Sequence, residues 1–95
     1  MTSYKLVGAI VSVKGDCTAG HKAREQIDLT IWDQEKDAAR RTPSLCAFFY
    51  NMIFPYLAVL QFGGEFPWEE DKDSFQMSCP DPINQVTIKV KRIRV

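Results

Sequence analysis

A thiol and an imidazole stand four positions apart in the segment GDCTAGH, residues 15–21. Cys17 and His21 are residue types that bind metal ions or act as nucleophile and base, and His21 is the only histidine of the chain. Gly15 and Gly20 bracket the pair and disfavour a regular helix. We therefore predict a turn that can fold both side chains to the same side.

Together with the other two cysteines, this pair has the residue types that form a closed zinc site. Three thiolates and one imidazole form a known tetrahedral zinc set, so zinc is a candidate cofactor here. Structural zinc sites usually take their ligands as close pairs, whereas Cys46 and Cys79 each stand alone. The alternative is that these two thiols are small buried hydrophobes. The candidate metal ligands are Cys17, His21, Cys46 and Cys79.

A nucleophilic thiol is a second possible chemistry. Cys46 falls near the start of a predicted helix, where the positive end of the dipole favours the reactive thiolate. His21 is the candidate base and Cys17 a further catalytic candidate. Without a metal, we expect His21 to be oriented by a backbone carbonyl or a carboxylate, with Asp16 or Asp81 as candidates.

Two loops add candidate binding residues. The first, residues 62–75, has two glycines and places Phe66 and Trp68 ahead of a run of acids. These rings are either walls of a pocket and interface anchors, or pins that hold the loop to the core. The second loop begins at Cys79 and includes Asp81 in a Pro-Asp-Pro turn, where binding loops usually lie.

The composition limits the partners. The chain has 95 residues, 45% hydrophobic and 25% charged, with 12 basic and 12 acidic side chains. This balance predicts one soluble domain, residues 1–95, without a global field for nucleic acid or an anionic membrane. Residues 45–60 are apolar but too short for a span, and contain Asn51 and Pro55. Three cysteines without a secretory signal favour reduced thiols in the cytoplasm.

Four segments have the pattern of strands. Residues 4–13 are rich in Val and Ile, and residues 27–32 alternate apolar and polar. Residues 75–79 and 86–90 also alternate and flank a turn, which predicts a hairpin. Beyond it the apolar phase shifts to Ile93 and Val95, so we predict a bulge near residues 91–92.

A central helix over residues 43–62 should position Cys46. Thr42 suits the N-cap and Pro43 the first helical position, and Gly63-Gly64 suits the end. Pro55 lies inside, so we expect a kink, with the Asn51 amide satisfying the freed carbonyl. The core-facing stripe comprises Leu45, Phe48, Phe49, Met52, Ile53, Tyr56, Leu57 and Leu60.

The opposite face of this helix is also apolar. It carries Ala47, Tyr50, Phe54 and Ala58, with only Asn51 and Gln61 as polar breaks. A domain this small seldom covers both faces of a helix, so a homo-oligomer is expected. Tyr50 and Asn51 are binding candidates on this face. The elements together predict an α+β fold of ββαββ order, an antiparallel sheet packed on one long, Pro-kinked central helix.

The segments GDCTAGHK, TPSLC, FPYLAVLQFGGEFPW and CPDPINQVTIKVKRI, in this order, resemble a widespread family of small prokaryotic proteins of unknown function. That family often continues after His-Lys with Val-Gly-Asp, where this chain has residues 23–25, Ala-Arg-Glu. The resemblance implies a shared site but no reaction. It marks Cys17, Gly20, His21, Cys46, Gly63, Gly64, Phe66, Pro67, Trp68, Cys79 and Asp81.

The sequence leaves two functions open. In the first, the Cys17 turn, the start of the helix at Cys46 and the Cys79 turn form a pocket for a small molecule or metal, and an enzymatic role there is open. In the second, the chain is a structural or protein-interaction module with inert thiols and with Phe66 and Trp68 at the contact surface.

Overall fold

The computed structural model describes residues 4–94, and it has the predicted α+β composition of one helix and an antiparallel sheet. Its element order departs from ββαββ because two very short strands precede the helix. The elements are β1 (Tyr4–Val13), β2 (Gln26–Asp28), β3 (Trp32–Asp33), β4 (Ala38–Ala39), α1 (Ala47–Gln61), β5 (Ser74–Ser78) and β6 (Val86–Arg94).

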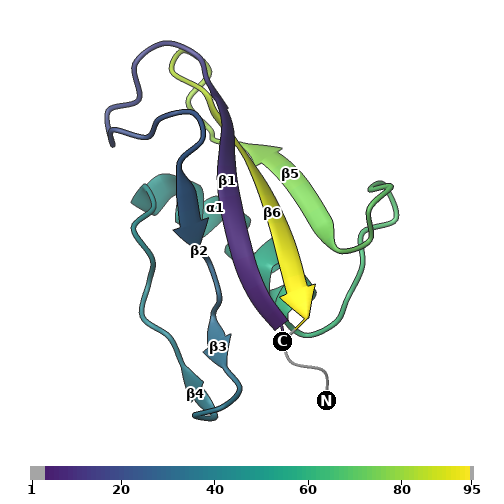
Figure 1. Cartoon of the computed structure of the whole chain (residues 1–95). Helices are drawn as coiled ribbons and strands as arrows, with labels where there is room; N and C mark the ends of the chain where they lie inside the picture. The colour runs from purple at the N-terminus through teal and green to yellow at the C-terminus, as the bar shows by residue number, and fades with distance from the viewer. Residues whose placement is uncertain (1–3, 95) are drawn as a thin grey trace.

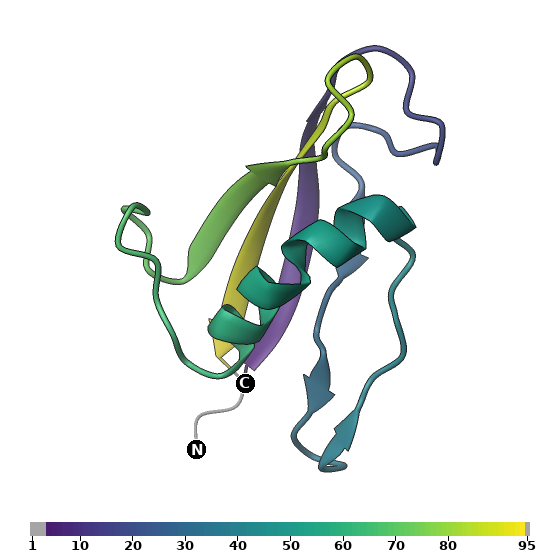
Figure 2. The same ribbon diagram turned by 180° about the vertical axis from the view of Figure 1, so that it is seen from behind.

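The main sheet has four antiparallel strands in the order β2-β1-β6-β5. The two long strands, β1 and β6, lie at its centre, and the predicted hairpin is the β5 and β6 pair. Helix α1 crosses one face of this sheet, as seen from the two sides in Figures 1 and 2. This layout brings segments from the beginning, middle and end of the chain to one end of the helix.

The core lies between α1 and the covered face of the sheet. Alternate residues of β1 and β6 point inward because successive side chains of a strand face opposite sides. They meet one stripe of α1 at helical spacing. The fully buried apolar side chains include Leu6, Ile10, Phe75, Val86, Ile88 and Val90 from the strands, and Phe49, Ile53, Leu57 and Leu60 from the helix. Phe48, predicted for this stripe, is instead 78% exposed.

The bulge predicted near residues 91–92 is wrong. Strand β6 keeps its alternation through Arg92, whose side chain is buried, and Ile93 is exposed. The register shift is on β1, between Ile10 and Ser12. The prediction was wrong because a buried arginine, rather than an apolar residue, occupies an inward position of the strand. Val95, the other residue on which the prediction rested, lies outside the described residues.

Helix α1 begins later than predicted. Thr42 and Pro43 precede it, and Cys46 is the N-cap residue. The C-terminal prediction is confirmed: Gly63 has a φ of 91°, and Gly64 N–H donates to the Val59 carbonyl at 2.7 Å. This is the usual left-handed end of a helix. Pro55 lies inside α1.

Residues 27–32, predicted as one strand, are divided. Strand β2 ends at Asp28, and β3 then pairs with β4 in a separate two-stranded sheet. This small sheet lies beyond the end of β2, away from the main sheet (Figure 1). Within residues 4–94 no helix is long and apolar enough to cross a membrane.

Candidate functional site

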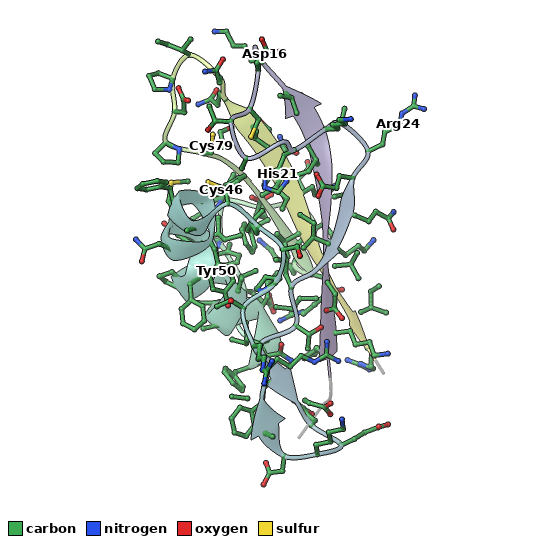
Figure 3. The ribbon with its side chains drawn as sticks, turned by 90° about the vertical axis from the view of Figure 1, so that its left-hand side faces the viewer. Asp16, His21, Arg24, Cys46, Tyr50 and Cys79 are labelled. Carbon is green, nitrogen blue, oxygen red and sulfur yellow. The ribbon has the colours of Figure 1, made fainter. Side chains whose placement is uncertain are left out.

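A cavity of about 350 Å³ lies at the N-terminal end of α1. Three segments enclose it: the loop after β1, the first turn of α1, and the turn between β5 and β6. Figure 3 shows His21, Cys46 and Cys79 together at this end of the helix, whereas Arg24 points away. The lining residues are Cys17, Thr18, His21, Cys46, Phe48, Phe49, Cys79, Pro80, Asp81, Asn84 and Val86.

Asn84 links the turn between β5 and β6 to the loop after β1. Its side-chain oxygen Oδ1 accepts a hydrogen bond from the Asp16 N–H at 2.9 Å. Gly15 has a φ of 77°, and a Cβ there would collide with the Asn84 side chain, so glycine is needed for this approach. Within the loop, Gly20 N–H donates to the Cys17 carbonyl at 3.0 Å and forms the predicted turn.

His21 links the loop after β1 to the start of α1. The side chain is 6% exposed, and its Nε2 accepts a hydrogen bond from the Cys46 N–H at 3.0 Å. Its Nδ1 lies 2.9 Å from Glu25 Oε1. Because Nε2 is an acceptor, we assign the ring proton to Nδ1, where it donates to the carboxylate.

The prediction that Asp16 or Asp81 orients His21 is therefore wrong. Glu25 supplies the carboxylate that orients the ring. The hydrogen bond from His21, aided by that from the Lys22 N–H, lowers the pKa of Glu25. The signal in the sequence was the four-residue spacing between His21 and Glu25. In a turn that spacing can bring the two side chains together.

This bonding determines what His21 can do. Both ring nitrogens are engaged, so in this arrangement His21 has no free lone pair for a metal ion or for a thiol proton. It instead fixes the backbone of Cys46 against the loop. Across residues 4–94 no group of three or more His, Cys, Asp or Glu side chains is placed to hold a metal ion. The zinc set stays a sequence prediction that this geometry does not support.

The three cysteines are free thiols in half-buried positions, and all of them line the cavity. The sulfur of Cys79 accepts a hydrogen bond from the Val86 N–H at 3.1 Å. Cys46 is the N-cap of α1, but its side chain makes no capping hydrogen bond. Cys79 thus has a structural bond in the turn, whereas the Cys46 sulfur is at the positive end of the helix dipole.

Asp81 gives the cavity a carboxylate. Its Oδ1 accepts hydrogen bonds from the N–H groups of Asn84, at 3.1 Å, and Ile83, at 2.9 Å. Both hydrogen bonds lower the pKa of Asp81, and the one from Asn84 has the larger effect. The carboxylate is therefore held in its charged form. The lining residues include no lysine or arginine.

The remaining predicted binding residues lie elsewhere. Phe66 is buried against Phe75 and Tyr56, whereas Trp68 is 65% exposed with its ring 5.1 Å from that of Phe66. Tyr50 and Asn51 line a separate groove of about 400 Å³ between α1 and residues 42–45, and burial raises the pKa of Tyr50. Phe66 therefore pins its loop to the core.

No protein-family model matches this chain, and no curated protein or solved structure shows a significant similarity to it. The family resemblance stated above stays a prediction.

Proposed function

We propose that this protein binds a small molecule in the thiol-lined cavity at the start of α1. The observation that carries the proposal is that Cys17, Cys46 and Cys79, from three separate segments, line one cavity of about 350 Å³. Pockets for small ligands have volumes of this order and combine apolar walls with a few polar groups. We propose binding here and no reaction.

The lining chemistry indicates the class of ligand. Phe49 and Val86 are buried apolar walls, and the three sulfurs are soft, polarisable groups. The Asp81 carboxylate disfavours an anion, and no lining side chain is cationic. The positive end of the α1 dipole in turn disfavours a cation, so we propose a neutral ligand with an apolar body and a thiophilic group.

Thiol modification of the native protein tests this proposal. We expect methyl methanethiosulfonate, a small neutral reagent, to modify Cys46 fastest, because its sulfur has no capping bond and lies at the positive end of α1. Cys79 should react slowest because its sulfur is packed in the turn between β5 and β6, 3.1 Å from the Val86 nitrogen, where the reagent has little room to approach. Mass spectrometry of digests taken over time gives the rate at each cysteine.

Cys46→Ser is the control, since it should remove the fast phase and leave the two slower ones. If all three thiols react only after unfolding, the cavity is closed to ligands and the proposal is wrong. Metal analysis of protein purified without an affinity tag tests the zinc prediction separately. Stoichiometric zinc that is lost in His21→Ala would establish the ligand role.

The second candidate function is a protein-interaction module. It is favoured by the exposure of large apolar side chains, namely Phe48, Phe54, Phe62 and Trp68. Inert thiols in the experiment above would favour it. The predicted cytoplasmic location is consistent with three free thiols and is tested by fractionation of cells that produce the protein.

A further inference from the structure

The outward face of α1 carries an apolar seam. Phe48, Met52, Pro55, Val59 and Phe62 follow one another at steps of four, three, four and three residues. This is the heptad spacing by which one helix packs against another along its length. Phe48, Pro55, Val59 and Phe62 are exposed, and Met52 is partly buried. An apolar seam of this kind on the solvent side indicates that a helix from a partner packs against it.

The segment that carries the seam is also uncharged. Residues 42–64 contain no Asp, Glu, Lys or Arg, although the chain has 24 such residues, 12 of each sign. A face that meets its own copy across a two-fold axis must tolerate each of its charges near a like charge. An uncharged face has no such conflict, which favours a second copy of this chain as the occupant.

A groove on the flank of α1 adjoins the seam at Pro55. It has a volume of about 400 Å³ and runs between α1 and the segment before it, lined in part by Tyr50, Asn51 and Phe54. Asn51 and Pro55 border both the groove and the seam, whereas Tyr50 lies on the far side of the groove from the seam.

Phe48 joins this face to the cavity. Its side chain lines the cavity, is 78% exposed, and is the first residue of the seam. We propose that two copies pair through this seam, with the two α1 helices antiparallel, and that each copy completes the mouth of the other's cavity. Antiparallel pairing sets opposite dipole ends side by side and places the partner's Phe62 near Phe48.

The pairing stands independently of the proposed ligand, whereas the closing of the cavity rests on the proposed function. Light scattering at micromolar concentration should give twice the chain mass. Val59→Lys should return the monomer mass because it places a charge in the seam. Val11→Lys is the matched control: the same residue type, also exposed, on β1 away from α1, and it should stay dimeric. Phe62→Lys is the second seam variant if Val59→Lys does not fold.

A wild-type monomer, or a dimer unaffected by both seam variants, would overturn the pairing. The closing of the cavity has its own measurement, the rate at which methyl methanethiosulfonate modifies Cys46. This rate should rise several-fold when the dimer dissociates on dilution or in Val59→Lys, and stay unchanged in Val11→Lys. Dissociation without any change in this rate would show that the partner does not cover the mouth.

Discussion

Glu25 and His21 form a charge-dependent link between the loop after β1 and the helix. The pKa of Glu25 lies below its ordinary value of 4.5, since His21 donates to its carboxylate. Such a group stabilises the fold above its ordinary pKa, and this contribution is lost as the pH falls through the lowered pKa. The link therefore weakens in acid.

Glu25→Gln should remove this contribution. We expect the free energy of unfolding of the variant to lie below that of the wild type at neutral pH. The difference should shrink as the pH falls below about 4.5. Urea unfolding at a series of pH values measures this, with Glu70→Gln, an exposed glutamate of the 65–73 loop, as control. A difference that does not vary with pH would contradict the assigned bond.

Phe66 and Trp68, although two residues apart, should differ strongly in their contribution to stability. Phe66 is 5% exposed and packs among aromatic rings, so Phe66→Ala should cost about 3–5 kcal/mol. Trp68 is mostly exposed, and its ring lies tilted against that of Phe66, so Trp68→Ala should cost about 1 kcal/mol or less. Thermal and urea unfolding compare the two, and equal costs would mean that Trp68 is covered in solution.

Arg92 connects the end of α1 to β6 and to the loop before β5. Its Nε donates to Asp73 Oδ1 at 2.8 Å, and its Nη1 donates to the Gly64 carbonyl at 2.7 Å and the Leu60 carbonyl at 3.3 Å. Its guanidinium carbon also lies 4.8 Å from the centre of the Tyr4 ring. A side chain of β6 thus adds a donor at the end of the helix, where the Leu60 carbonyl also accepts the Gly63 N–H at 3.3 Å.

Arg92→Met keeps the length of the side chain but removes these donors. We expect a loss of about 1.5–3 kcal/mol in the free energy of unfolding, because carbonyls at the end of α1 lose a charged donor, while the exposed Asp73 carboxylate can bind water instead. Lys89→Met, an exposed change on the same strand, should stay within about 0.5 kcal/mol. A loss below about 1 kcal/mol for Arg92→Met would show that water replaces the guanidinium readily.

Strands and the helix end could be predicted where a local pattern controls them. The alternation in residues 86–90 and the two glycines after α1 are such patterns, and both gave correct elements. The start of α1 could not be predicted in this way, because Cys46 is bound by His21, 25 positions away. The buried Arg92 likewise depends on partners distant in sequence. From the sequence alone, a charged residue at an inward position was therefore interpreted as a change in the alternation of the strand.

The clustering of the cysteines was foreseen, but the bonding around them was not. Cys17, Cys46 and Cys79 each adjoin a turn or a helix start, and such positions gather at the ends of strands and helices. Which carboxylate holds His21 depends on the path of the loop, where Arg24 has a φ of 73°. A positive φ at an arginine has no signal in the sequence, and it places Glu25 beside the ring.

The pairing of β1 with β6 sets the order of events when the chain folds. Among the described strands β1 is synthesised first and β6 last, so β1 lacks its long neighbour until translation has passed Arg94. Contacts between distant segments form slowly because a long loop must close first. The thiols meet only when β6 docks against β1. During synthesis, Cys17 and Cys46 are therefore in solvent before the cavity that they line has formed.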